Sequence, residues 1–208
     1  MKSTKYVLLG LGISLAACQS SNKTDDKTAD SVNHVSRDTQ IPNEKFLVVA
    51  GRSVGEISIG EDMEQVGKKL GRPDAGDAAM GKAWGIWYSN DSTAQHPNEI
   101  AVYSSYRDTS MRVKDVKQIR ITSDQFKTKE GLSTGTTLEE TKLKFPAIEK
   151  LSTYLNEDKD TVTVYDAKKE GIGFEFLKGK SISLTVHQVN IPVNGTYLTL
   201  HPEWKIVE

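Results

Sequence analysis

Apolar residues recur along this 208-residue chain in two rhythms, one helical and one alternating. In the first, Met63, Val66 and Leu70 recur at helical spacing, and polar residues fill the positions between them. This pattern predicts an amphipathic helix that begins after Gly60. The helix should end before Pro73, because proline cannot continue a helix and disfavours helical backbone before it.

The same pattern returns later in the chain. Gly60 of the first copy matches Gly135 of the second, and Leu70 matches Phe145. Self-similarity of this kind indicates a tandem repeat. We therefore expect two related structural units, 45–129 and 130–208.

The second copy carries its own helix signal. Thr136, with Glu139 three residues on, fits a capping box and predicts a helix over 136–145. A short helical turn is expected over 147–154. Each unit would then begin with one or two helices.

The alternating rhythm predicts the strands. Six stretches alternate in this way: 84–88, 100–106, 116–121, 161–165, 171–177 and 181–186. In the second unit we expect one shared buried face, formed by Val162, Val164, Ile172, Phe174, Phe176, Ile182, Leu184 and Val186. Alternation of this kind is typical of antiparallel strands with one covered face. Asn194-Gly195 predicts a C-terminal hairpin that joins 191–193 to 197–200.

Together these elements predict an α+β fold. It would contain two tandem repeats, each with one or two helices packed on a three- to four-stranded antiparallel sheet.

Composition and charge exclude several classes of function. The formal net charge is −1, so no basic excess points to nucleic acid. The single cysteine excludes an intrachain disulfide. We find no phosphate-binding glycine loop and no Gly-x-Ser-x-Gly nucleophile turn. No cofactor is therefore expected.

The N-terminus predicts export and a lipid anchor. Residues 1–17 have a basic start and a short apolar core, as an export signal does. Ala17 and Cys18 end a Leu-Ala-Ala-Cys sequence that resembles the lipobox of bacterial lipoproteins. The resemblance implies cleavage between these two residues and lipid on Cys18. The alternative is an ordinary secretory signal with an incidental cysteine.

The residue after Cys18 and the stretch that follows bear on location. Gln19 follows the lipidated residue, which in lipoproteins of enteric type implies the outer membrane, on its periplasmic side or at the surface. Residues 18–44 are polar and nearly lack aliphatic side chains, so we expect a disordered tether.

The repeated Ile-Gly…Met/Leu-Glu…Val…Leu-Gly-x-Pro pattern resembles a known fold. It is shared by the BamE (SmpA/OmlA) lipoprotein family and the β-lactamase inhibitory protein. The resemblance covers 52–189 and implies a helical pair against a sheet, and action by binding. The inhibitory protein is stapled by disulfides that this chain cannot form, and BamE is a single unit.

Catalytic and metal-ligating residues are scarce. The four histidines, His34, His96, His187 and His201, show no pairing at metal-ligand spacing, so we expect no metal site. A hydrolase built on His187 and nearby acids is the enzymatic alternative.

Three aromatic residues form the candidate binding site. If Trp84 points into the core, alternation sends Trp87 to the opposite face, and Tyr103 and Tyr165 should face outward too. Exposed Trp and Tyr are typical anchors of a protein partner. The alternatives are that residues 190–208 cover this face, or that Trp87 is core. An exposed Trp87 predicts that Trp87→Ala leaves folding intact.

The sequence therefore predicts a lipid-anchored envelope lipoprotein that acts as a non-catalytic protein-binding or scaffold module. Its expected partner is another envelope protein. The first alternative is an inhibitor that blocks an envelope or extracellular enzyme through the face of its sheet.

Overall fold

The computed structural model describes residues 43–90 and 97–207. The predicted signal peptide, Ala17, Cys18 and nearly all of the predicted tether lie outside these residues. The described residues form two α-helices and thirteen strands in two sheets. The fold is therefore mostly β, and the predicted α+β class is wrong. No helix in the described ranges is long and apolar enough to cross a membrane.

The smaller sheet has four short strands. A 3-10 helix, Glu44–Phe46, leads into it. Its strands, in the order β3-β2-β1-β8, are Ile57–Ser58, Ser53–Val54, Leu47–Val49 and Lys127–Thr128. β1 pairs antiparallel with β2 and parallel with β8, so the start of the described chain is held beside the segment that follows β7.

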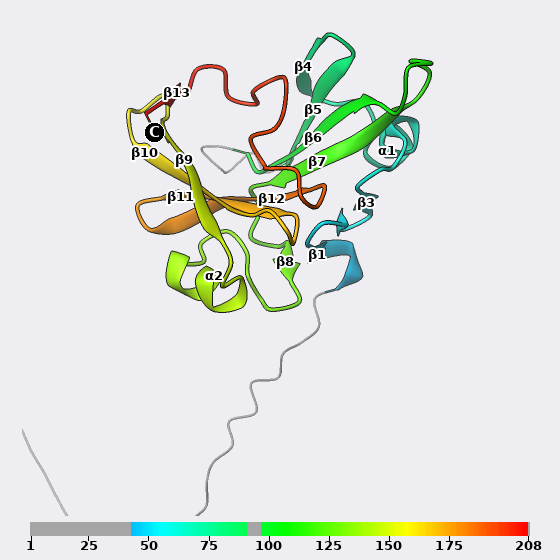
Figure 1. Ribbon diagram of the computed structural model, residues 1–208. Coiled ribbons are helices and arrows are strands. Elements are labelled where there is room, and N and C mark those ends of the chain that lie inside the picture. The colour runs from blue at the N-terminus through cyan, green and yellow to red at the C-terminus, as the bar shows by residue number, and fades with distance from the viewer. Residues whose placement is uncertain (1–42, 91–96, 208) are drawn as a thin grey trace, which may run out of the picture. The chain divides into compact units, whose positions relative to one another are not determined.

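The larger sheet has nine strands, and every neighbouring pair is antiparallel (Figure 1). Its order is β13-β9-β10-β11-β12-β7-β6-β5-β4. In chain order the strands are β4 Ala75–Ala79, β5 Lys82–Tyr88, β6 Glu99–Tyr106, β7 Lys114–Ile121, β9 Glu149–Leu155, β10 Thr161–Ala167, β11 Ile172–Leu177, β12 Lys180–His187 and β13 Lys205–Ile206. The six strands expected from alternation all occur.

A helix followed by four strands occurs twice, and the two sets meet where β7 pairs with β12. Equivalent glycines precede the two helices. The Gly60 amide donates to Val116 O at 2.8 Å, and the Gly135 amide donates to Ser181 O at 2.7 Å. Both glycines have positive φ, +81° and +86°, which favours glycine over other residues. Each helix therefore starts from the same contact with the last strand of its set.

The two helices are short. α1 spans Met63–Leu70, with Asp62 as its N-cap and Gly71 as its C-cap at φ +79°, so the helix predicted here is confirmed. α2 spans Leu138–Lys144. Its capping box uses Thr137 and Glu140, one residue later than the sequence predicted. The shift follows from Gly135, because the backbone turns there and Thr136 O instead accepts from Ser181 N.

We expect Thr137→Ala to lower the free energy of unfolding by about 1 kcal/mol, because the Thr137 hydroxyl caps the Glu140 amide. Urea denaturation of the two proteins measures the difference. Equal stability of wild type and variant would mean that this cap contributes nothing to the fold.

The main core lies on one face of the large sheet. Alternate residues of β7, β11 and β12 point into it, together with Val66 of α1 and Val48, Val54 and Ile57 of the small sheet. The buried set from the large sheet includes Trp87, Val102, Val116, Ile119, Ile121, Ala167, Ile172, Phe174, Phe176, Leu184 and Val186. In Figure 1, α2, β1 and β8 lie on this side of the sheet.

Several strands were not predicted from the sequence, and the two longest of them, β9 and β4, lie in the larger sheet. Residues 149–155, expected within a helical turn, form β9, because pairing with β10 outweighs local preference. Residues 75–79 form β4 although Ala and Gly have low strand propensity, because they pair with β5 at the edge of the sheet. These two strands account for much of the error in fold class.

Two further expectations about the second half are wrong. Asn194 and Gly195 form a turn, in which the Gly195 amide donates to Pro192 O at 2.8 Å, but no strand flanks it. Val162, Val164 and Ile182 do not join Phe174 in the main core. The β10–β11 register places Val164 opposite Glu175 and Tyr165 opposite Phe174, and the β11–β12 pairing shifts its register at Ile182. Because no strand flanks the turn at Asn194 and Gly195, the predicted C-terminal hairpin is absent from the described residues, and residues 188–204 cross the sheet instead.

Candidate functional site

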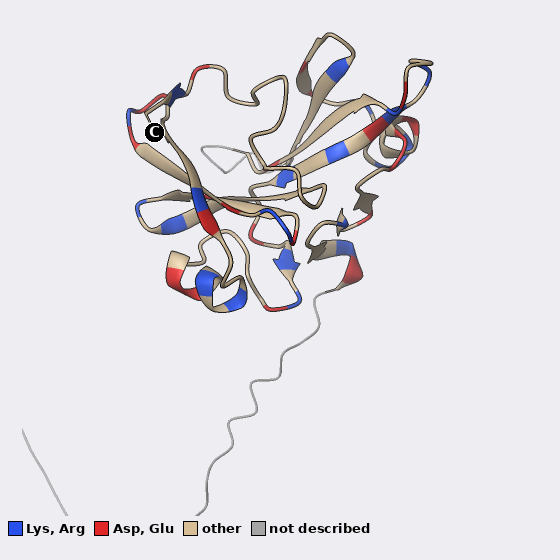
Figure 2. Cartoon of the chain, in the orientation of Figure 1, with Lys and Arg blue, Asp and Glu red and all other residues tan. Residues whose placement is uncertain are grey.

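Residues 188–204, which we call the strap, cover the face of the large sheet that points away from the core. In Figure 1 the strap is the red segment that runs from the end of β12 across the upper side of the sheet to β13. Glu203 is its single charged residue, apart from His201, and Figure 2 shows the strap mostly in tan while acidic and basic residues are interspersed elsewhere. The strap thus turns an exposed sheet face into a buried one.

The covered face is polar at its centre. Gln118 and Arg120 of β7 point toward the strap, because they alternate with Ile119 and Ile121 of the core. Arg120 lies opposite Thr185 of β12 in the strand register. The strap therefore seals buried polar groups that need partners.

Hydrogen bonds fasten the strap to the sheet. Gln118 Nε2 donates to Val193 O at 2.8 Å, and the Val193 amide donates to Asp166 Oδ2 at 3.0 Å. Further along, Trp84 Nε1 donates to Leu198 O at 3.0 Å. Since these bonds come from three different strands, the strap is positioned along its length.

Glycine and apolar contacts complete the fastening. A Cβ at Gly173 would lie 3.1 Å from the Val193 side chain, so the missing side chain lets the strap approach closely. Leu198 and Leu200 pack against a small cluster that contains Trp84 and Tyr103. This cluster is a second, smaller core, separate from the main one.

His187 is part of the hydrogen-bond network that holds the strap on the sheet. Its ring is fully buried, with Nε2 3.0 Å from Asp166 Oδ1 and Nδ1 3.0 Å from Gln188 O. The other carboxylate oxygen of Asp166 accepts from the strap at Val193. Both ring nitrogens are thus engaged, and the ring does not line the pocket described below.

We expect Asp166→Ala to loosen the strap, because His187 Nε2 and the Val193 amide would both lose their buried acceptor. The free energy of unfolding should fall by about 1–3 kcal/mol. Limited proteolysis should cut 188–200 faster than in wild type. Asp160→Ala, which removes a partner of exposed Lys178 only, is the matched control. Unchanged protection of the strap in Asp166→Ala would contradict this role.

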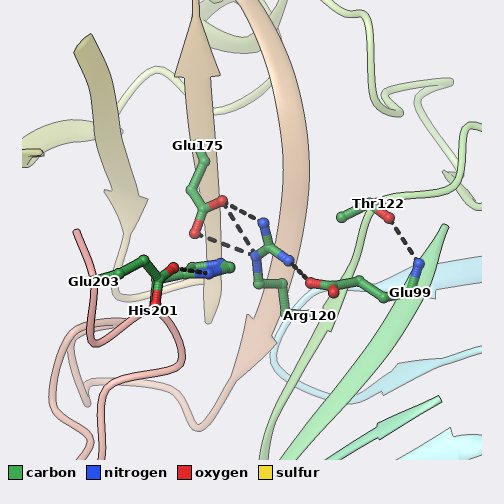
Figure 3. Close-up of polar contacts among 6 residues, drawn as sticks. All are labelled: Glu99, Arg120, Thr122, Glu175, His201 and Glu203. Atoms are coloured by element: carbon green, nitrogen blue, oxygen red, sulfur yellow. Dashed lines mark hydrogen bonds and ion pairs between the residues drawn. The ribbon is translucent and has the colours of Figure 1, made fainter. Parts of the chain in front are cut away.

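A buried guanidinium lies at the centre of the covered face (Figure 3). Arg120 donates from Nη2 to Glu175 Oε2 at 2.7 Å, from Nε to both Glu175 oxygens at 3.2 Å, and from Nη1 to Glu99. Its side chain is 6% exposed. The Glu99 amide in turn donates to Thr122 Oγ1 at 2.8 Å, which fixes the start of β6. Every nitrogen of the guanidinium is therefore committed to a carboxylate.

Mutual attraction keeps this cluster ionised. Burial opposes the charged form of Arg120, but the charges of Glu175 and Glu99 outweigh it and raise the pKa of Arg120. Burial is the largest single influence on Glu175 and acts to raise its pKa, but the charge and hydrogen bonds of Arg120, together with smaller contributions from His201 and Ser183, lower that pKa overall. One guanidinium between two carboxylates leaves the cluster with a negative balance.

His201 of the strap lies beside this cluster. Burial, and then the charge of Arg120, lower the pKa of His201, which favours the neutral form of its ring. The ring stacks on Trp204, with centroids 4.1 Å apart, and Nδ1 lies 3.3 Å from Glu203 Oε1. Because the carboxylate of Glu203 can only accept a hydrogen bond, we assign the ring proton to Nδ1. Nε2 is then an acceptor, and it is buried without a partner.

A pocket of about 200 Å³ lies between the strap and the sheet. Aromatic rings of Trp84, Tyr154 and Trp204 form part of its wall. Glu175 and His201 place acceptors beside it. The full lining is Trp84, Gln118, Arg120, Tyr154, Val164, Glu175, Thr185, Val193, Asn194, Thr196, Thr199, Leu200, His201, Pro202 and Trp204. We take this pocket as the candidate functional site.

The structure does not bring the three predicted binding residues together. Trp87 is 9% exposed within the main core, and its Nε1 donates to Gly71 O at 3.2 Å. Tyr103 is buried beneath the strap, where its hydroxyl accepts from the Tyr197 amide at 3.0 Å. Tyr165 lies on the core side against Phe176. The predicted outward directions of Trp87 and Tyr165 are therefore wrong, and Tyr103 lies on the covered face instead of an exposed one.

Sequence reasoning missed Arg120, Glu175 and His201. Two of them carried a local signal: Arg120 lies between Ile119 and Ile121, and Glu175 lies between Phe174 and Phe176. A charged residue at a regular position of an apolar strand marks the opposite face. No local pattern indicated that this face is covered, because the strap comes from the end of the chain.

The function of the pocket could also be indicated by a metal site or by similarity to a known protein. Within 43–90 and 97–207, no three His, Cys, Asp or Glu side chains lie together in a way that could hold a metal ion. The chain matches no model of a known protein family, no curated protein and no solved structure. The pocket's function is therefore inferred from its own residues.

Proposed function

We propose that this chain is an envelope lipoprotein, anchored through Cys18, whose folded domain acts by binding a partner in the pocket beneath the strap. The observation that carries the proposal is the pocket itself: aromatic walls, committed charges and one buried acceptor without a partner. Buried polar groups without partners are rare, and a ligand is one way to satisfy them.

The fixed charges favour binding over catalysis. Arg120 and Glu175 are paired with each other, and His187 is fully buried with both nitrogens engaged. A general base must reach the proton that it removes. The hydrolase alternative, which depends on His187, therefore has no support in this geometry.

The position of the strap also bears on the inhibitor alternative. That alternative needs a sheet face open to the target enzyme. One face of the large sheet is covered by the core elements, and the strap covers the other. A pocket at one place, and not a broad sheet surface, is what the covered face offers.

The anchor can be tested by membrane fractionation. We expect the wild type to sediment with membranes and Cys18→Ala to remain in the soluble fraction, because lipid on the thiol is the proposed attachment. Ser20→Ala, two residues on, is the matched control and should sediment like the wild type. Equal sedimentation of all three proteins would overturn the proposed anchor.

Pocket binding can be tested with a variant that fills the pocket. Thr199 lines the pocket from the exposed strap, so Thr199→Trp should obstruct it without touching the core. Native mass spectrometry of protein released gently from membranes should show a bound component in the wild type that is lost in this variant. Leu143→Ser, an 80%-exposed position on α2, is the control and should keep it. No difference between Thr199→Trp and wild type would overturn the site.

A further inference from the structure

We propose that the pocket beneath the strap recognises a primary alkylammonium group, of the kind that a lysine side chain carries. This inference rests on the proposed function and names the chemistry that the same pocket selects. It follows from the pocket's size, its acceptors and its aromatic walls.

The size of the pocket limits what can enter. At about 200 Å³ it is smaller than the range of about 300–1,000 Å³ typical of drug-sized ligands. One extended side chain or a short diamine fits such a volume. A folded surface or a large cofactor does not.

The acceptors of the pocket call for a donor. His201 Nε2 is buried and has no hydrogen-bond partner. With the ring proton assigned to Nδ1, beside Glu203, Nε2 is an acceptor. Glu175 adds carboxylate oxygens at the pocket wall. An ammonium group brings three N–H donors and no acceptor. One N–H can therefore donate to His201 Nε2, the acceptor without a partner, and another can add a bond to Glu175, whose oxygens already accept from Arg120.

The charge balance points the same way. Arg120 is surrounded by Glu175 and Glu99, and each of its nitrogens already donates to one of them. An anion would have to displace one of these carboxylates from a buried position. A cation instead adds the positive charge that the two carboxylates leave uncompensated.

The aromatic walls suit a cation on an apolar stem. Trp84, Tyr154 and Trp204 present rings to the pocket, and Tyr154 and Trp204 lie with their centroids 6.3 Å apart. Trp and Tyr faces attract ammonium groups within about 6 Å. The same rings pack against the methylene groups of a lysine stem.

Titration calorimetry with matched small ligands tests the inference on the full folded domain. We expect Nα-acetyl-lysine amide to bind and Nα-acetyl-norleucine amide, which has the same stem without the ammonium, to bind about tenfold more weakly or not at all. Cadaverine, a free diamine, tests whether the alkylammonium group comes from a small amine or from a lysine side chain of a protein. Equal binding of cadaverine favours a free amine, and stronger binding of the lysine derivative favours a lysine of a protein partner.

Variants test whether the ammonium group binds at His201. His201→Phe keeps a ring against Trp204 and removes the acceptor, so lysine binding should weaken about tenfold. Tyr197→Ala, outside the pocket lining, is the control and should bind as the wild type does. Circular dichroism checks that both variants are folded. If His201→Phe shows an altered spectrum, Thr199→Trp serves in its place.

Three results would overturn the inference: equal binding of norleucine and lysine, undiminished binding by folded His201→Phe, and absence of lysine binding by the wild type. If the native mass spectrometry above still shows a component lost in Thr199→Trp, the proposed function survives and only the ammonium chemistry fails. If both experiments are negative, the inference and the proposed function both fail.

Discussion

Replacing Arg120 by Met should lower the free energy of unfolding by about 3–5 kcal/mol. The substitution keeps an unbranched stem of similar length but leaves Glu175 and Glu99 buried without their counter-charge. Their side chains are 15% and 16% exposed, so water replaces the lost bonds only in part. Removing one partner of a buried ion pair is costly for this reason. Urea denaturation followed by circular dichroism measures the loss.

A rescue variant separates charge from packing. In Arg120→Met/Glu99→Gln/Glu175→Gln the unpaired charges are gone, so most of the lost stability should return. Arg107→Met, which breaks an ion pair with Asp115 on a side chain that is 52% exposed, should have a much smaller effect. If Arg120→Met were as stable as Arg107→Met, the buried cluster would have no structural role.

The pH dependence of the two proteins should differ in a defined direction. Arg120 lowers the pKa of Glu175 in the folded wild type, so this group stabilises the fold above its unfolded pKa of about 4.5. That contribution is lost as the pH falls through the lowered folded pKa. In Arg120→Met, burial becomes the dominant influence on Glu175 and raises its pKa, so acidification should reduce the difference in stability between wild type and variant. A difference that grows below pH 4.5 would contradict this.

The six strands with clear alternation could be predicted from the sequence, because alternation is a local property. β11 and β12 illustrate this, since Phe174 and Leu184 occupy the buried face that their pattern indicates. The overall class could not be predicted in the same way. β4 and β9 exist through pairing with β5 and β10, and neither has a strong pattern of its own.

Which face of the sheet each side chain of β5 points to could not be predicted from the local sequence, for a different reason. Alternation reveals direction only when one face of a strand is exposed to water. Trp84 faces the strap and Trp87 faces the main core, so both faces are buried. The strap comes from more than a hundred residues later, as the Trp84–Leu198 bond shows. Either direction of the strand fits the local sequence equally well.

The candidate site depends on the same long-range contact. Arg120 and Glu175 are 55 residues apart, and His201 reaches them only because the strap crosses the sheet. The sequence offered 190–208 as a possible cover of the sheet face, without saying what it would enclose. The covered face combines a small apolar cluster with the buried charges of Arg120 and Glu175, and the pocket with its one acceptor without a partner lies beside those charges.

Trp87→Ala should lower the free energy of unfolding by about 3–5 kcal/mol, and this reverses the expectation from the sequence. Trp87 is 9% exposed among Val102, Ile119 and the other residues of the main core. Truncation removes a large buried ring and leaves a cavity beside these side chains. It also frees Gly71 O, which accepts from Trp87 Nε1 at the end of α1. Urea denaturation followed by far-ultraviolet circular dichroism measures the change without relying on tryptophan emission.

Two controls make the result specific to burial. Tyr197→Ala removes an aromatic ring that is 60% exposed on the strap, and its stability should stay within about 0.5 kcal/mol of wild type. Trp87→Phe keeps a ring in the core and should cost less than Trp87→Ala, because the cavity is smaller. If Trp87→Ala and Tyr197→Ala were equally mild, Trp87 would not be a core residue. If only Trp87→Ala loses stability, Trp87 stabilises the fold through its burial in the main core. If the folded Trp87→Phe variant binds in the pocket beneath the strap as the wild type does, Trp87 has no part in recognition.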